Sequence, residues 1–300
     1  MTAIELRDLD DPRLNDFARL TDSALRRRID SERGLYLAES KFVFERALAA
    51  GHEPRSVLAE RSALAEVEFQ LTAAGYGDAA REQAGLPPVP VFTGDAAVLE
   101  RLTGFELHHG VIGCMNRPAP LDAADVIAGP TAVDAAAGVA AGTGGRRRLV
   151  VVEGVVDPTN VGLIFRSAGA LGADGILLTP RTADPLYRRA VRMSMGTVLQ
   201  VPWAHVGGWR ELAPQLHDAG YHVATLALDE RSVTLDEFAD QVRTAPDRFG
   251  RLALVLGSEG YGVSDACLRA ADALVEIPMA HGIDSLNVAA SSAVAMWALR

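Results

Sequence analysis

The sequence has few cysteines, almost no lysine and no long uninterrupted apolar run. Cys114 and Cys267 lie in widely separated segments of the 300-residue chain, so neither a disulfide framework nor a metal cluster is expected. The most apolar stretches, 191–206 and 289–299, are short or interrupted by polar residues, which argues against a membrane-spanning helix. Residues 1–11 carry four acidic side chains and no apolar signal core. We therefore expect a cytoplasmic protein without a bound metal.

The chain is acidic, with a formal net charge of −10. This charge discourages nucleic-acid binding, which depends on basic side chains, but does not exclude it where those side chains cluster. Every basic residue except Lys41 is an arginine, whose planar guanidinium suits phosphate. A solvated helix face is the simpler interpretation of any single cluster. The clusters are Arg26–Arg28 with Arg33, Arg146–Arg148, and Arg188 and Arg189 with Arg192.

The order of apolar segments predicts two α/β domains. Residues 1–117 alternate short strands and helices and predict a small α/β domain. Residues 118–148 are rich in Ala, Gly, Pro and Thr and predict a linker. Residues 149–300 predict a doubly wound α/β domain, because almost continuous apolar runs are typical of a parallel sheet covered on both faces. The runs that predict its strands are 149–156, 175–178, 197–202, 222–228, 251–256 and 273–277.

Ligands of open parallel sheets bind beyond the carboxyl ends of the strands, and three loops at such positions carry polar residues or glycine. The first loop is 157–166 (DPTNVGLIFR). We expect Asn160 to cap the following helix and Gly162 to let another backbone approach. Arg166 is expected near the same helix face as Asn160. An ordinary helix start is the alternative for this loop alone.

The second loop, 257–262 (GSEGYG), lacks the spacing of a dinucleotide fingerprint or a P-loop. It is either a tight turn or a backbone that approaches another flat ligand. The third segment begins with Ile277-Pro278-Met279 and reaches Ser285-Leu286-Asn287 before a helix predicted over 288–299. Ser285 is expected to cap that helix, and small side chains make the helix slim.

In this order and spacing, the three segments resemble motifs 1, 2 and 3 of the SpoU/TrmH family of SPOUT methyltransferases. The matching residues are Asn160-x-Gly162-x-x-x-Arg166, Leu256-Gly257-Ser258-Glu259-Gly260-x-Gly262, and Ile277-Pro278-Met279 followed by Ser285-Leu286-Asn287-Val288. The resemblance covers essentially all of residues 149–300. Residues 1–117 also resemble the family's L30e-like substrate-binding domain, at 35–39 and 108–111, although Ser40 stands where the family often has glycine.

The resemblance implies a C-terminal trefoil knot, a homodimer and S-adenosylmethionine as cofactor. It also implies methyl transfer to a ribose 2′-hydroxyl of RNA. The cofactor-binding residues are then Leu256, Gly257, Gly260, Ile277, Met279 and Leu286.

Five residues carry the implied catalytic site. Arg166 is the family's candidate for gripping the neighbouring phosphate and polarising the hydroxyl. Our hypothesis is that Asn160 places Arg166 or the ribose and that Glu259 forms hydrogen bonds or balances charge. Ser285 and Asn287 are expected to contact the nucleotide. No metal is needed for this chemistry.

The identity of the RNA stays open at this point. The separate N-terminal domain favours ribosomal RNA, 23S in particular, over transfer RNA. Two other classes of function compete with methyl transfer. A nicotinamide oxidoreductase would need a glycine fingerprint that is absent after the first strand of 149–300. A non-catalytic knotted RNA-binding protein would have lost the motif residues, all of which are present.

Overall fold

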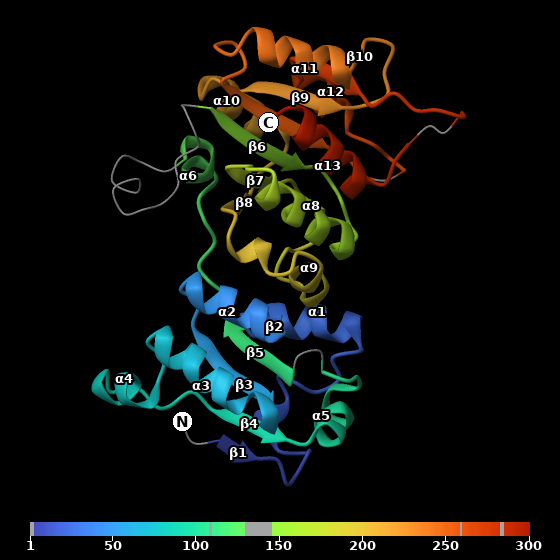
Figure 1. Ribbon diagram of the computed structural model, residues 1–300. Helices are drawn as coiled ribbons and strands as arrows, with labels where there is room; N and C mark the ends of the chain where they lie inside the picture. The colour runs from blue at the N-terminus through green and yellow to red at the C-terminus, as the bar shows by residue number, and fades with distance from the viewer. Residues whose placement is uncertain (1–2, 108–109, 130–145, 259, 283–284) are drawn as a thin grey trace. The chain divides into compact units, whose positions relative to one another are not determined.

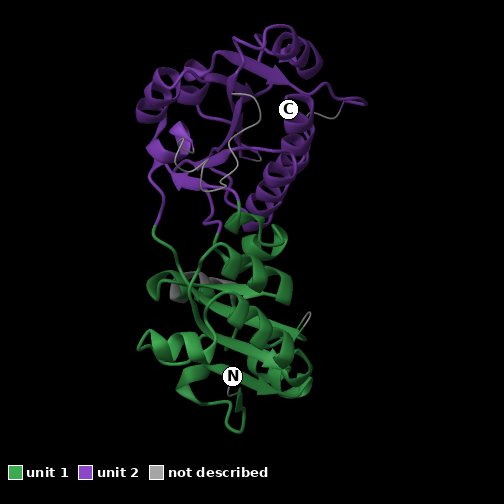
Figure 2. Cartoon of the chain, turned by 60° about the vertical axis from the view of Figure 1, so that its left-hand side comes forward, with its two compact units in different colours: residues 1–119, 186–200 green, residues 120–185, 201–300 purple. Residues whose placement is uncertain are grey.

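A computed structural model describes most of the chain. The chain divides into two compact units (Figure 2). Unit 1 contains Met1–Ala119 and Leu186–Gln200, and unit 2 contains Pro120–Pro185 and Val201–Arg300. In the described part, no helix is both long and apolar enough to cross a membrane. The residues described are 3–107, 110–129, 146–258, 260–282 and 285–300.

Unit 1 is built on a five-stranded mixed sheet in the order β1-β4-β3-β5-β2 (Figure 1). Strand β5 is antiparallel to β2 and β3, whereas β1 and β3 are parallel to β4. Its strands are β1 (Ala3–Glu5), β2 (Leu35–Glu39), β3 (Pro54–Glu60), β4 (Val91–Gly94) and β5 (Val111–Asn116). Its helices are η1 (Pro12–Leu14), α1 (Ser23–Glu32), α2 (Lys41–Ala49), η2 (Arg61–Ala63), α3 (Leu64–Ala73), α4 (Asp78–Gln83), α5 (Ala96–Thr103), α9 (Arg188–Met193) and η5 (Thr197–Leu199).

The segment 186–200 belongs to unit 1, although the sequence predicts it within the catalytic domain 149–300. Helix α9 packs against β2. There the Arg188 guanidinium donates to the Glu39 carboxylate at 2.9 Å, and the Glu39 side chain is only 3% exposed. A buried carboxylate needs such a partner, because burial of an unpaired charge is costly. This tertiary contact therefore holds a segment of the second half of the sequence in unit 1.

The predicted strand 197–202 is wrong. The chain forms the 3-10 helix η5 there, after Gly196 turns the backbone at φ +80°, and the strand β8 begins only at Trp203. The nearly continuous apolar run of this segment suggested a strand. Pro202 has no backbone N–H to donate to a neighbouring strand, and β8 starts just beyond it.

Ser40 occupies a backbone conformation that favours glycine. Its φ is 91° and its ψ 153°, and its Oγ accepts from the Val43 N–H at 3.4 Å to cap α2. Non-glycine residues in this region store strain of about 1–3 kcal/mol. The departure from the family's glycine therefore combines a helix cap with a strained backbone.

We expect Ser40→Gly to raise the free energy of unfolding by about 1 kcal/mol, because relief of strain outweighs the loss of the cap. Ser40→Ala removes the cap oxygen, keeps the strain and lowers stability by about 1 kcal/mol. Urea unfolding of both variants measures the difference. A Ser40→Gly protein as unstable as Ser40→Ala would show that the backbone at this residue is not strained.

Unit 2 is built on a seven-stranded sheet in the order β10-β12-β9-β11-β6-β7-β8, and every pairing in it is parallel. This confirms the predicted α/β class with a parallel sheet. Its strands are β6 (Arg147–Val152), β7 (Gly175–Leu178), β8 (Trp203–His205), β9 (His222–Leu226), β10 (Val233–Thr234), β11 (Arg251–Leu256) and β12 (Ala273–Glu276). Its helices are α6 (Ala123–Ala128), α8 (Pro158–Ala170), α10 (Trp209–Asp218), α11 (Leu235–Thr244), α12 (Asp265–Ala270) and α13 (Val288–Ala298).

Helices cover both faces of this sheet (Figure 1). On one face, side chains of α6, α10 and α12 form a buried core with Val151 of β6 and Val255 of β11. On the other face, α8 and α13 pack against each other, and Met296 of α13 lies with Val150 and Leu254 of the sheet. The threading of the C-terminal segment through a loop, and the likeness of unit 1 to the L30e fold, stay predictions.

The predicted linker 118–148 is wrong at residues 123–128, which form helix α6. Asp122 caps this helix through the N–H of Ala124, and Val126 and Ile127 are each 4% exposed in the core of unit 2. The composition of the segment concealed the helix, although an Asp before the helix and Gly129 after it are ordinary start and stop signals. The remainder of the predicted linker, residues 130–145, lies outside the described part.

Candidate active site at the carboxyl edge of the parallel sheet

The loops that follow β9, β11 and β12 surround a cavity of about 510 Å³, together with the start of α13. A volume of this size is typical of cofactor and small-ligand sites. The structure brings together all of the residues predicted to bind the cofactor: Leu256, Gly257, Gly260, Ile277, Met279 and Leu286 line this cavity. Ser285, predicted to contact the nucleotide, lines it as well and is exposed.

The wall of the cavity formed by loop 257–262 is a closed turn. The Ser258 N–H donates to the Gly262 carbonyl at 3.0 Å, and the Gly262 N–H donates to the Ser258 carbonyl at 2.9 Å. A Cβ on Gly257 would lie 2.5 Å from the Gly262 carbonyl carbon, so only glycine fits at that position. Gly260 and Gly262 have φ of +86° and +63°. The glycines of this loop thus serve a close backbone crossing and a tight reversal.

Asn160 and Asn287 join the first and third motifs. The Asn287 Nδ2 donates to the Asn160 Oδ1 at 3.1 Å, and Asn160 is 5% exposed. The Asn287 Oδ1 accepts from the N–H groups of Ala289 and Ala290, at 3.0 and 3.4 Å. Asn287 is therefore the N-cap of α13 and also ties that helix to α8.

Both predicted helix caps are wrong. Asp157, not Asn160, caps α8: its Oδ1 accepts from the Thr159 N–H at 2.9 Å, and Pro158 occupies the first helical position. Asn287, rather than Ser285, caps α13. Both segments contain more than one residue type that can cap a helix, so composition alone could not identify the cap, and the predictions miss it by three and two residues.

We expect Asn160→Ala to lower the free energy of unfolding by about 1 kcal/mol, since it removes the acceptor of the Asn287 amide. Asn287→Ala also removes the cap and costs about 2 kcal/mol. The double variant should lose less than the sum of the two, because the residues share one hydrogen bond. Asn160→Asp, which keeps an acceptor oxygen, is the matched control. Additive losses in urea unfolding would contradict the coupling.

Arg166 lies on the exposed surface of α8, and its guanidinium has no hydrogen bond or ion pair with the described residues. The prediction that it shares a helix face with Asn160 is wrong, because six residues rotate by about 600°, or 240° beyond one full turn. The buried Asn160 therefore does not place Arg166. Glu259 lies outside the described residues.

A second cavity of about 800 Å³ adjoins the other side of loop 257–262. It shares Ser258, Tyr261, Gly262 and Val263 with the first cavity, and Asn160 also lines it. On its wall, the Glu153 carboxylate accepts from the Trp209 indole N–H at 2.9 Å and from the Ser264 hydroxyl at 2.7 Å. Sequence reasoning missed this cavity, although Glu153 is a carboxylate directly after a buried strand.

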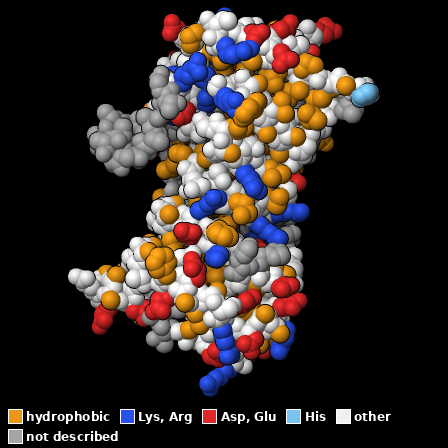
Figure 3. Space-filling model, viewed as in Figure 1, with side chains coloured by type: hydrophobic (Ala, Val, Ile, Leu, Met, Phe, Trp, Pro, Cys, Tyr) orange, Lys and Arg blue, Asp and Glu red, His pale blue; other side chains and the backbone are white. Residues whose placement is uncertain are grey.

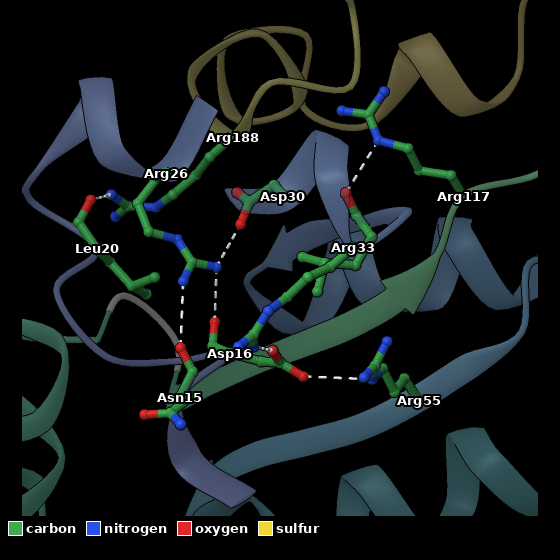
Figure 4. A network of polar contacts seen from close by, with 10 residues as sticks. Asn15, Asp16, Leu20, Arg26, Asp30, Arg33, Arg55, Arg117 and Arg188 are labelled. Atoms are coloured by element: carbon green, nitrogen blue, oxygen red, sulfur yellow. Dashed lines mark hydrogen bonds and ion pairs between the residues drawn. The ribbon is translucent and has the colours of Figure 1, made fainter. Parts of the chain in front are cut away.

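Some arginines of the predicted basic clusters form contacts inside the protein. Arg26 is 4% exposed: it pairs with Asp30 at 2.5 Å and donates to the Asn15 and Asp16 carbonyls (Figure 4). Burial raises the pKa of Asp30 to about 6 and lowers the pKa of Arg26. A guanidinium held in this way is not available to RNA phosphate.

The second arginine cluster is also largely committed to internal contacts. Arg147 donates to the Val126 carbonyl at 3.0 Å, and Arg148 donates to the Leu299 carbonyl at 2.9 Å.

Arg189 and Arg192 of the third cluster are exposed. The face of unit 1 shown in Figure 3 exposes both acidic and basic side chains.

Comparison with known proteins agrees with this geometry. Residues 147–297 match the model of the SpoU rRNA Methylase family. An uncharacterized tRNA/rRNA methyltransferase of Mycobacterium bovis is 34% identical over 97% of this chain and 89% of its own length. An AdoMet-bound rRNA methyltransferase from Sinorhizobium meliloti has the same fold, with a TM-score of 0.74, 24% identity and coverage of 99% of this chain and 97% of that one. A structure described as an RNA 2′-O ribose methyltransferase gives a TM-score of 0.68 at 22% identity, covering 99% of this chain and 98% of that one.

The parallel sheet with its cavity at the carboxyl edge is thus the α/β fold of the SPOUT methyltransferases. The chain belongs to the SpoU rRNA methylase family, a family of RNA methyltransferases.

Proposed function

We propose that this protein transfers a methyl group from S-adenosylmethionine to a ribose 2′-hydroxyl of ribosomal RNA, in the 23S molecule. The observation that carries the proposal is the convergence of motif residues far apart in the sequence on one cavity of about 510 Å³. The likeness of this chain to a structure described as an RNA 2′-O ribose methyltransferase supports transfer to the 2′-hydroxyl. Ribosomal RNA acts in the cytoplasm, where we place the enzyme. Transfer RNA is the alternative substrate.

The lining of the first cavity suits S-adenosylmethionine. Leu226, Leu256 and Val275 offer apolar surface to a flat adenine ring, while the glycines of loop 257–262 let the ligand approach backbone groups. Glu276 and Ser285 add polar groups for the ribose and the amino-acid portion. When bound, this sulfonium cofactor supplies a methyl carbon that is open to nucleophilic attack.

The residues of the protein must orient the ribose and disperse charge during the transfer. A bound cofactor would supply the methyl group to the 2′-oxygen and keep the electron pair of the carbon–sulfur bond, and the hydroxyl proton would leave to solvent. Arg166 carries a planar, positively charged guanidinium, a group that suits phosphate. We therefore assign it to the phosphate next to the ribose, where its charge stabilises the developing alkoxide.

We further propose that the active site is completed in a homodimer. Arg166 lines neither of the two cavities of its own copy. It lies on α8, which packs against α13. Helix α13 exposes apolar side chains, with Val294 42% and Trp297 57% exposed. A second copy of the chain seated on this surface would bury these side chains and bring Arg166 to the partner's cavity.

Mapping ribose methylation tests the function. RNA from cells with and without the gene is hydrolysed in alkali, and linkages protected by 2′-O-methylation are compared across ribosomal and transfer RNA. We expect one protected site in 23S RNA that disappears on deletion and returns with the wild-type gene. A lost site in transfer RNA would select the alternative substrate, and no lost site would overturn the proposal. Calorimetry with S-adenosylmethionine and with a nicotinamide dinucleotide distinguishes the cofactor classes.

A further inference from the structure

We propose that the second cavity binds the base of the nucleotide whose ribose is methylated, with Tyr261 as its stacking surface. The inference rests on the proposed function and adds a binding site for the RNA base beside the cofactor cavity. Tyr261 lines both cavities, because it stands on the loop that separates them. A base stacked there would hold its ribose at the border of the cofactor cavity.

Tyr261 stands in an exposed position on a hydrogen-bonded turn. It is 90% exposed, and no ring contact ties it to the described residues. The paired hydrogen bonds between Ser258 and Gly262 close the turn beneath it, and the glycines on either side carry no side chain that could cover the ring. RNA-binding proteins use such aromatic side chains to stack unpaired bases. An exposed tyrosine on a closed turn is therefore suited to a base rather than to a packed core.

The cavity behind Tyr261 also offers polar groups to a base. The Glu153 carboxylate is oriented by the Trp209 indole and by Ser264, whose N–H donates to it at 3.2 Å and whose hydroxyl donates at 2.7 Å. Oε1 already accepts from both the indole and the hydroxyl, whereas Oε2 accepts only the Ser264 N–H and has a second lone pair for an N–H group of a ligand. Amino and imino groups on the edge of a base supply such donors. Glu153 could thus bind the edge of a base whose face stacks on Tyr261.

Arg181 adds a positive charge to the same cavity. It is exposed, lines the cavity and has φ +73°, a conformation that is unfavourable for a side-chain-bearing residue. Strained backbone of this kind occurs at binding sites more than elsewhere. Its guanidinium has no hydrogen bond or ion pair with the residues that the structure describes. A phosphate next to the stacked base would supply its partner.

Tyr261 has one other possible role, which is to cover the cofactor in the first cavity. The two roles predict different losses in the Tyr261→Ala variant. Loss of a base contact lowers kcat/KM for RNA and leaves the affinity for S-adenosylmethionine unchanged. Loss of a cofactor cover weakens S-adenosylmethionine binding in the absence of RNA.

The test measures methyl transfer from tritiated S-adenosylmethionine to total RNA of a gene-deleted strain. We expect Tyr261→Ala to lower kcat/KM for RNA about 10–100-fold, the range for loss of one base–aromatic stack. Tyr261→Phe should recover most of that loss. Arg210→Ala, which removes an exposed side chain of unit 2 that lines neither cavity, is the control. Calorimetry should show cofactor affinity within about threefold of wild type, below the 1.4 kcal/mol of a tenfold change.

Three results separate the proposals. A wild-type protein that transfers no methyl group to this RNA overturns the proposed function and the base site that depends on it. An active wild type with unchanged kcat/KM in Tyr261→Ala overturns the base site alone. A Tyr261→Ala protein with weakened cofactor binding assigns the residue to the cofactor and also overturns the base site.

Discussion

Replacing Arg166 by alanine is expected to lower the rate of methyl transfer about 100–1000-fold, the usual effect of removing one group that stabilises transition-state charge. Affinity for S-adenosylmethionine should be unchanged, because Arg166 lies outside the cofactor cavity of its own copy and is assigned to the phosphate of the RNA. Its side chain is exposed, so the free energy of unfolding should change by less than about 0.5 kcal/mol. The measurements are single-turnover transfer of a tritiated methyl group, calorimetry and urea unfolding.

Two controls make this result specific to the position. Arg210→Ala removes another exposed arginine from unit 2 and should leave transfer unchanged. Arg166→Lys keeps the charge but loses the planar fork, so we expect activity between wild type and alanine. A fully active Arg166→Ala protein would remove this residue from the mechanism, whatever the RNA.

A mixing experiment tests whether Arg166 acts across a dimer. Copies with Arg166→Ala are combined with copies that lack a functional cofactor cavity, such as Gly257→Ala. If each active site uses the arginine of one copy and the cavity of the other, a hybrid dimer contains one intact site and activity returns. If both parts come from the same copy, every site in the hybrid has one defect and no activity returns.

Sequence patterns located the strands better than the helix ends. The runs 175–178 and 251–256 coincide with β7 and β11, because interior strands of a parallel sheet are apolar throughout. The linker prediction failed at α6, whose two large apolar residues pack into a core formed by residues far away in the sequence. Its short apolar pattern carries little information without those partners.

In the candidate site, too, the sequence identified some features and missed others. Its cofactor-lining residues could be named from motifs, since each motif follows a strand that ends at one edge of the sheet. The hydrogen bond between Asn160 and Asn287 could not be predicted, because it joins residues 127 positions apart through the packing of two helices. The exposure of Arg166 depends on which face of α8 packs against the rest of unit 2, and only the structure reveals that face.

Gly257→Ala is expected to weaken S-adenosylmethionine binding about 100-fold or more, because a displacement of about 1 Å in a site can have that effect. A Cβ at this position would lie 2.5 and 2.7 Å from the carbonyl carbon and oxygen of Gly262. Both are backbone atoms fixed by the two hydrogen bonds with Ser258. The turn must therefore open, which moves the wall shared by the two cavities and lowers stability by about 1–3 kcal/mol.

Gly172→Ala is the matched control for this substitution. Gly172 has φ +78° and open space around a built Cβ, so alanine there adds backbone strain of about 1 kcal/mol without a collision. We expect it to lose stability but bind the cofactor like wild type. Calorimetry and urea unfolding compare the two variants. Wild-type cofactor affinity in Gly257→Ala would show that the turn yields without disturbing the cavity, and the close crossing of Gly257 and Gly262 would then have no part in forming the site.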